Sequence, residues 1–161
     1  MALPIVELTA KIMTDERSPF WVTKKLEQMS RTEWESLCDS CGRCCLYKLE
    51  DDETGEIYYT DVGCRYLNSD SCRCSDYSQR QQLVPDCLVL DIGQPEYIRM
   101  LPNSCAYRQL YEGEPLAEWH PLISGNPNSV HEAGISIKDK YVTDDEIDTD
   151  NLEDHIIGKL D

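Results

Sequence analysis

The sequence predicts a small, irregular α+β domain with N-terminal helices and short strands, held together by bound metal. Leu, Ile, Val and Phe make up only about a fifth of the 161 residues, so the apolar core is thin for a chain of this length. The nine cysteines supply a second means of cross-linking that core. Helical and alternating apolar patterns occur only over short stretches, which predicts both kinds of element and no long one.

The cysteines divide the chain into three parts, because all nine lie between Cys38 and Cys105. We expect a helical N-terminal arm over residues 1–37 and a cysteine-cluster, metal-binding core over 38–112. A loop-rich, acidic C-terminal part occupies 113–161. We expect this last part to pack on the same single domain as the core.

The arm carries two helical signals. Apolar residues recur at helical spacing between Trp21 and Met29. Ser30 and Glu33 then match a capping box, in which each side chain satisfies a free amide at a helix start. The second helix is expected to weaken at Gly42, so the first cysteines lie at a helix end and in the adjoining loop.

Short elements are also expected after the first cysteines. Residues 46–49 and 57–59 flank an acidic turn, which predicts a hairpin or a pair of short strands. Cys72-Arg73-Cys74 would place both thiols on one side of an extended strand, and residues 104–111 favour a short helix. Prolines and glycines break 113–134 into loops, and a second capping-box match at Thr143–Glu146 precedes amphipathic helical spacing from Leu152 to Leu160.

The sharpest motif is the run Cys38-Asp39-Ser40-Cys41-Gly42-Arg43-Cys44-Cys45. A two-residue gap lets two thiolates face one ion across a tight turn. Zinc sites usually take two ligands from each of two such turns, whereas iron–sulfur clusters often take three from a C-x2-C-x2-C run and one from elsewhere. This wrap favours iron over zinc, although thiolates suit both. The fourth ligand would be Cys45 or a remote residue.

Two other interpretations compete with metal binding. A disulfide framework fits poorly with an odd number of cysteines, an adjacent Cys44–Cys45 pair and no secretion signal. Buried apolar thiols fit poorly with such regular spacing. Nine thiols could form two four-ligand sites with one to spare, or one site beside a redox-active pair. Arg43, Arg65 and Arg73 each adjoin a cysteine, where they would favour thiolate or simply keep the surface polar.

The cysteine motif and the later cysteines together resemble a known family. Cys-x2-Cys-Gly-x-Cys-Cys, the later Cys-Ser-x-Tyr-x-x-Arg and two further cysteines resemble the YkgJ-type cysteine-cluster family, which is described as chelating zinc or iron. Over nearly the whole chain, including the segments 101–108 and 119–122, the sequence looks like the YcgN-type bacterial branch of that family. The resemblance implies metal binding and no particular reaction.

The resemblance also implies which residues are ligands, and Cys72 looks like an extra cysteine. The implied metal ligands are Cys38, Cys41, Cys44, Cys45, Cys64, Cys74, Cys87 and Cys105. The sequence departs from the family after Arg80, where the usual Arg-Pro-x-x-Cys is replaced and Cys87 lies seven positions on. This departure leaves the equivalence of Cys87 open.

The three histidines are weaker candidates. His120 lies in a turn-rich segment where a ligand or an acid–base role is conceivable, but a hydrogen-bonded structural histidine is the favoured interpretation. His131 receives the same interpretation, and His155 is expected to be a solvated residue of the tail helix. No phosphate-binding loop, nucleophile elbow or paired metalloprotease histidines are present.

Charge restricts the partners. The formal net charge is −16, from 15 Lys and Arg against 31 Asp and Glu. Nucleic acids and anionic membranes require a clustered positive surface, so neither is expected as a partner. No apolar run approaches the ~18 residues of a membrane span, and the N-terminus has no signal-peptide pattern. We therefore expect a cytoplasmic protein.

Three functions remain open from the sequence. The favoured hypothesis is a metal-binding protein with a cysteine-ligated iron centre, in the form of an iron–sulfur cluster, or a zinc centre, acting in redox or metal handling. The first alternative is a zinc-stabilised protein-interaction module that docks an unidentified protein partner through the acidic tail. The second alternative is a metal-dependent enzyme whose unidentified substrate binds near Trp119–Gly125. No catalytic residue is identifiable, and the acidic tail is otherwise a solvated segment that helps solubility.

Overall fold

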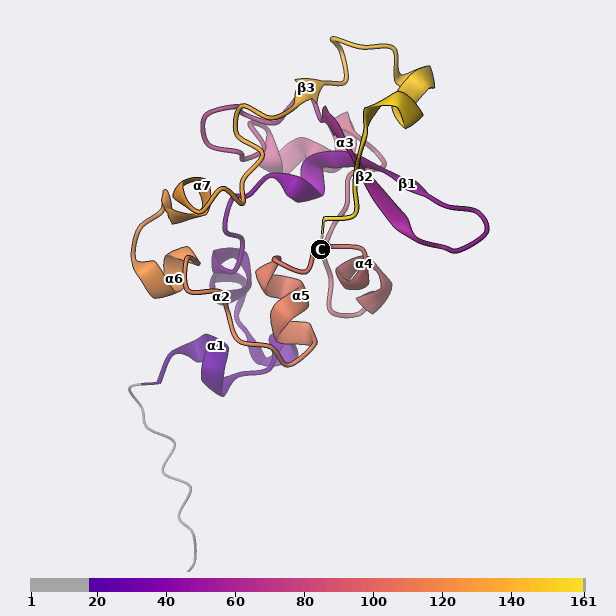
Figure 1. Cartoon of the computed structure of the whole chain (residues 1–161). Coiled ribbons are helices and arrows are strands. Elements are labelled where there is room, and N and C mark those ends of the chain that lie inside the picture. Colours follow the sequence, from indigo (N-terminus) through magenta and orange to yellow (C-terminus); the bar gives the residue numbers. More distant parts are fainter. Residues whose placement is uncertain (1–17, 161) are drawn as a thin grey trace, which may run out of the picture.

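A small four-stranded sheet lies beside a group of short helices, which confirms the expected α+β class (Figure 1). The computed structural model describes residues 18–160. The α-helices are α1 (Phe20–Thr23), α2 (Arg31–Ser36), α3 (Arg80–Leu83), α4 (Pro95–Arg99), α5 (Ala106–Tyr111), α6 (Pro121–Ser124) and α7 (Ser129–Glu132). The 3-10 turns are η1 (Leu26–Gln28), η2 (Arg43–Cys45), η3 (Tyr77–Gln79) and η4 (Thr149–His155).

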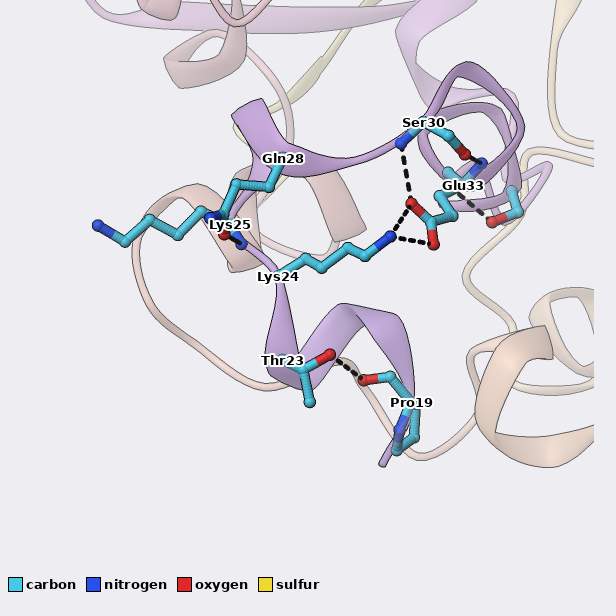
Figure 2. A network of polar contacts seen from close by, with 8 residues as sticks. Pro19, Thr23, Lys24, Lys25, Gln28, Ser30 and Glu33 are labelled. Atoms are coloured by element: carbon cyan, nitrogen blue, oxygen red, sulfur yellow. Dashed lines mark hydrogen bonds and ion pairs between the residues drawn. The ribbon is translucent and has the colours of Figure 1, made fainter. Parts of the chain in front are cut away.

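The capping box at Ser30 is confirmed and begins α2. The Ser30 hydroxyl accepts a hydrogen bond from the Glu33 N–H at 3.2 Å, and the Glu33 carboxylate accepts one from the Ser30 N–H at 2.8 Å. The Lys24 ammonium lies 2.7 Å from the same carboxylate (Figure 2). The helix expected over 21–29 is instead split into α1 and η1, because Lys24 and Lys25 are extended between them.

The sheet is built on β2 (Ile57–Gly63), and the expected hairpin with β1 (Leu46–Glu50) is confirmed. On the other side of β2, β3 (Val142–Thr143) pairs parallel to its end and β4 (Ile156–Gly158) pairs antiparallel to its middle. The tail helix expected over 152–160 is therefore wrong. Backbone pairing with β2 outweighs a weak helical periodicity. The Thr143–Glu146 capping contacts form, but a turn follows them directly and the 3-10 helix η4 begins only at Thr149.

The apolar core consists of two clusters joined by the cysteine motif. The helical cluster includes Leu37 and Tyr107, and the sheet cluster includes Leu46 and Ile137. Leu37 and Leu46 are both buried, and they flank the motif at residues 38–45. The motif is thus anchored at both ends by packing. Within residues 18–160, no helix is long and apolar enough to cross a membrane.

The extended strand expected at Cys72-Arg73-Cys74 is also wrong. Cys72 has φ of +54°, and it ends a turn in which the Asn68 side chain accepts hydrogen bonds from Asp70 and Ser71. Only Cys74 pairs across this turn, in an isolated antiparallel bridge with Leu67. The two thiols therefore belong to different surroundings.

Candidate metal centre

The cysteine motif folds as a tight loop rather than as a helix. Ser40 and Gly42 both have positive φ, of 67° and 76°. A Cβ atom at Gly42 would lie 2.9 Å from Cγ1 of Ile137 and 3.2 Å from Cβ of Cys72. Only glycine fits this combination of backbone conformation and close approach. The loop therefore presents its thiols at fixed positions on top of the sheet cluster.

Two remote segments are tied to this loop by hydrogen bonds. The Arg43 guanidinium donates from Nε to the Ile135 carbonyl at 2.7 Å and from Nη1 to the Ser104 hydroxyl at 3.0 Å. The Ile137 N–H donates to the Cys41 carbonyl at 2.9 Å. The bond to Ser104 brings the next residue, Cys105, to the motif, although 60 residues of chain separate it from Cys45.

The first thiol group consists of Cys38, Cys41, Cys44 and Cys105, gathered around Asp39. Burial raises the pKa of Cys41 well above its usual range, and the charges of Asp39, Cys44 and Cys105 raise it further. Burial likewise raises the pKa of Cys105, followed by the charges of Asp39 and Cys44. Packing around the Cys38 thiol, followed by Cys44, raises its pKa to about 11. These four side chains are electrostatic neighbours.

The second thiol group consists of Cys45, Cys64, Cys74 and Cys87. Cys45 precedes β1 and Cys64 comes directly after β2, and the Cys64 N–H donates to the Cys45 carbonyl at 3.1 Å. The turn closed by the Leu67–Cys74 bridge returns Cys74 to Cys64. Burial raises the pKa of Cys87, and the charges of Cys74, Cys64 and Cys44 raise it further against the opposing Arg80. Cys87, left open by the sequence, therefore lies with this group.

Cys44 and Cys45 connect the two groups. Their side chains are hydrogen-bonded to each other, which lowers the pKa of Cys44 and raises that of Cys45. Lys48 lies beside them and donates from Nζ to the Cys44 and Leu46 carbonyls, each at 2.9 Å. Burial lowers the pKa of Lys48, and the charges of Cys44 and Cys45 oppose that shift. The ammonium thus offsets negative charge where the two groups meet.

Cys72 packs against Gly42 of the motif, but its surroundings differ from those of the two thiol groups. It is buried in the sheet cluster with Ile137. Burial raises the pKa of its thiol, and the charged neighbours that act on it are Lys138 and Asp139 rather than thiols. Whether Cys72 is a ligand or an extra cysteine therefore stays a prediction.

The eight thiols of the two groups suit a thiophilic metal, although they are not closed around a common point. Cys38 and Cys44 are exposed, Cys41 is buried and the other five are half-buried, so the paired groups reach solvent. Within residues 18–160, no three His, Cys, Asp or Glu side chains already converge as a metal site. Thiolates are ligands for zinc and for iron–sulfur clusters, and closing such a site on its metal is coupled to ordering of the chain.

Two residues of this centre were missed by the sequence interpretation. Asp39 is 5% exposed; its Oδ1 accepts the Cys41 N–H at 2.8 Å, and its Oδ2 has no hydrogen-bond partner within the described residues. A carboxylate between two closely spaced cysteines is a signal that could have identified it. Lys48 lies three residues beyond the motif in β1, where nothing in the sequence marks it as a neighbour of the thiols.

The arginines that adjoin cysteines divide into three cases. Arg43 ties the motif to Ile135 and Ser104. Arg65 forms an ion pair with the buried Asp144, at 3.0 Å from Nε to Oδ1, and its partner also accepts a hydrogen bond from the Tyr47 hydroxyl. Arg73 is exposed, and its charge lowers the pKa of Cys38. The charge of Arg65 likewise lowers the pKa of Cys64, so both Arg65 and Arg73 act on a neighbouring thiol.

All three histidines are hydrogen-bonded. His120 is buried; its Nε2 lies 2.9 Å from the Leu37 carbonyl and its Nδ1 accepts the Leu122 N–H. This arrangement fixes the end of α2, and Leu37 directly precedes the first cysteine of the motif. His131 bonds to Ser136, and His155 pairs with Asp61 of β2 at 2.8 Å. His155 is therefore tied to the sheet rather than solvated on a helix.

A pocket of about 360 Å³ is lined in part by Tyr59. Arg99, Arg108 and Lys159 line it together with apolar residues. Burial raises the pKa of Tyr59, and the charges of Cys44 and Cys105 raise it further, which places this ring next to the thiols. Its hydroxyl donates to the Met100 carbonyl at 2.7 Å.

Comparisons with known proteins place the cysteine motif in a described family. Residues 37–106 match a family model described as "CxxCxxCC: Putative zinc- or iron-chelating domain". A UPF0260 protein of Parvibaculum lavamentivorans is 52% identical over 91% of this chain and 95% of its own length. UPF0260 proteins of Cellvibrio japonicus and Rhodopseudomonas palustris are 54% and 55% identical over 86% of this chain, and over 94% and 82% of their own lengths. No solved structure matches.

Proposed function

This chain belongs to the UPF0260 family and carries the CxxCxxCC domain, and we propose that it is a metal-binding protein whose centre is held by cysteine thiolates. One observation carries the proposal. Eight of the nine cysteines, drawn from segments up to 67 residues apart, are electrostatic neighbours in two linked groups, and the ninth lies outside both.

The two groups would each supply four ligands. The first set would be Cys38, Cys41, Cys44 and Cys105, and the second Cys45, Cys64, Cys74 and Cys87. Four thiolates satisfy either a tetrahedral zinc ion or an iron–sulfur cluster. The adjacent Cys44 and Cys45 would place the two sites side by side, with Lys48 offsetting the charge of the thiolates.

Iron, in the form of an iron–sulfur cluster, is the metal that the motif favours. Cys38, Cys41 and Cys44 form a C-x2-C-x2-C run with Cys105 as the remote ligand, which is the division that such clusters often use. A bound cluster would supply one-electron redox chemistry. Zinc in the same sites would be structural, and the protein would then be an interaction module.

The remaining parts of the proposal concern context. We place the protein in the cytoplasm and in the YcgN-type branch. We expect neither a nucleic acid nor an anionic membrane as a partner, because the net charge of −16 would repel both. We also propose the division into an arm at 1–37, a core at 38–112 and a C-terminal part at 113–161 that packs on the core. The hydrogen bond from Arg43 of the core to Ile135 of the last part supports this packing.

A differential alkylation experiment tests metal binding at these cysteines. Cys44 is exposed, and its thiol ionises readily beside Cys45, so a free Cys44 would react quickly with iodoacetamide. The protein purified anaerobically should resist labelling at Cys44 until a chelator removes the metal, as read by peptide mass spectrometry. Equal labelling of Cys44 before and after chelation would overturn the proposal. Cys72, outside both groups, serves as the internal control.

A further inference from the structure

Asp39 carries a buried oxygen that the fold leaves unused. One carboxylate oxygen, Oδ1, accepts the Cys41 N–H at 2.8 Å and shapes the turn between Cys38 and Cys41. The other, Oδ2, is buried and has no hydrogen-bond partner among residues 18–160. Only 5% of Asp39 is exposed. Buried carboxylate oxygens are normally paired or bound to a metal, because water cannot reach them.

No cation of the described chain neutralises this carboxylate. The guanidinium of Arg43, four residues away, is directed to the Ile135 carbonyl and the Ser104 hydroxyl. The ammonium of Lys48 is directed to the Cys44 and Leu46 carbonyls. The charge of Asp39 acts to raise the pKa of each thiol of the first group, namely Cys38, Cys41, Cys44 and Cys105, so these thiols are its acidic neighbours. A set of acidic groups gathered around an unpaired carboxylate lacks the positive charge that would balance it.

We propose that Oδ2 of Asp39 is an oxygen ligand of the metal held by the first thiol group. This inference rests on the proposed function and names a donor that a cysteine count does not include. The first group would then be a mixed thiolate–carboxylate site for Zn²⁺ or Fe²⁺, in which Oδ2 takes one of the four ligand positions in place of one of the four thiolates, while the second group remains all sulfur. A carboxylate is a harder donor than a thiolate, so the two sites would differ in metal preference.

A purely local role does not explain Asp39. Asp51 shows what a local role needs, because its Oδ1 accepts the N–H groups of Glu53 and Thr54 in the exposed hairpin turn. Asp51 lies in the turn that joins β1 to β2. Asp39 makes the same kind of turn with one oxygen but is buried, which leaves the second oxygen available for a ligand.

The test compares two aspartate-to-asparagine variants in metal titrations. The full chain, stripped of metal under anaerobic conditions, is titrated with Zn²⁺ against a chromophoric chelator and with Co²⁺ while its visible spectrum is recorded. Asp39→Asn keeps an oxygen that can accept the Cys41 N–H, so the turn is preserved while the carboxylate is lost. Asp51→Asn makes the identical chemical change in the other turn.

We expect Asp39→Asn to weaken Zn²⁺ binding at one site by about tenfold or more and to change the Co²⁺ spectrum of that site, while Asp51→Asn matches the wild type. Asp39→Ser, whose hydroxyl can also accept the Cys41 N–H, should repeat this result. Unchanged affinity and an unchanged spectrum in Asp39→Asn would overturn the inference and leave the cysteine sites standing. A wild-type chain that takes up neither ion would overturn the proposed function itself.

Discussion

Arg43, in the middle of the cysteine motif, donates a hydrogen bond at 2.7 Å to the carbonyl oxygen of Ile135, which lies 92 residues further along the chain. The same guanidinium holds Ser104, the residue before Cys105. One side chain therefore fixes the relative positions of three segments that each contribute to the first thiol group or to its support. The acidic C-terminal part is in this way a structural component of the centre.

The first prediction concerns this tie. Arg43→Met would leave the Ile135 carbonyl unpaired and release Ser104, so we expect it to lower the free energy of unfolding by about 2–3 kcal/mol. Urea denaturation of the metal-loaded protein measures the change. Arg31→Met is the matched control, because Arg31 is 76% exposed and makes only an i,i+4 ion pair with Glu35, worth about 0.5 kcal/mol or less. Equal losses in the two variants would contradict the role of Arg43.

The second prediction concerns the tight loop. Gly42→Ala would place a methyl group 2.9 Å from Cγ1 of Ile137 at a φ of 76°, whereas Gly125→Ala meets open space at a φ of 69°. Both variants carry the cost of left-handed backbone, about 1 kcal/mol. We expect Gly42→Ala to cost about 1–3 kcal/mol more than Gly125→Ala, as measured by thermal denaturation. Shortening the contacting side chain in Gly42→Ala/Ile137→Val should recover part of the difference.

The third prediction separates ligands from the remaining cysteine. Cys41→Ser should reduce metal content and folding together, because Cys41 is buried within the first thiol group. Cys72→Ser should keep the wild-type metal content and lose about 1–3 kcal/mol of stability, since a hydroxyl replaces a buried sulfur beside Ile137. Elemental analysis per chain and urea denaturation of both variants give the two readings. Comparable metal loss in both would remove the distinction between Cys72 and the other eight.

The fourth prediction is a pH dependence at the start of α2. The Lys24 ammonium, followed by the Ser30 N–H, lowers the pKa of Glu33 from its ordinary value of 4.5 (Figure 2). A carboxyl group whose pKa falls on folding stabilises the fold above its unfolded pKa and loses that contribution as the pH falls through its folded pKa. Glu33→Gln should therefore lower the urea midpoint at pH 7.

The difference between wild type and Glu33→Gln should shrink as the pH is lowered from 7 to about 3. Glu53→Gln, in the exposed hairpin turn, should show little difference at either pH. If the difference in urea midpoint between wild type and Glu33→Gln stays constant across this pH range, the charge of Glu33 contributes nothing to the stability of the helix start.

Local signals in the sequence predicted those elements whose determinants lie within a few residues. The Ser30–Glu33 capping box, the β1–β2 hairpin and the helix at Ala106–Tyr111 all form as expected. The helix predicted for the C-terminal tail is wrong because the tail's partner is remote in sequence. Ile156 pairs with Thr60 in β2 instead of continuing a helix. The extended strand predicted at Cys72 is wrong because the turn at Asn68 imposes a positive φ there, which the spacing of two cysteines does not reveal.

The candidate centre shows the same division. The spacing from Cys38 to Cys45 indicates thiolate chemistry directly. Which later cysteine joins which group depends on long-range bonds, such as those from Cys64 to Cys45 and from Arg43 to Ser104, and these depend on tertiary structure alone. Asp39 is part of the cysteine motif, but only its burial and its unpaired oxygen in the structure distinguish it from an ordinary turn aspartate.

The most direct test of the central claim is the metal content of the native protein. The chain would be purified anaerobically without a metal-chelating tag, and one sample would be divided for elemental analysis, acid-labile sulfide and a visible spectrum. We predict iron with matching sulfide and a broad absorption near ~400 nm, all lost in Cys41→Ser. Stoichiometric zinc without colour would keep the thiolate centre and replace iron. A colourless protein with neither metal and nine freely titratable thiols would contradict the account.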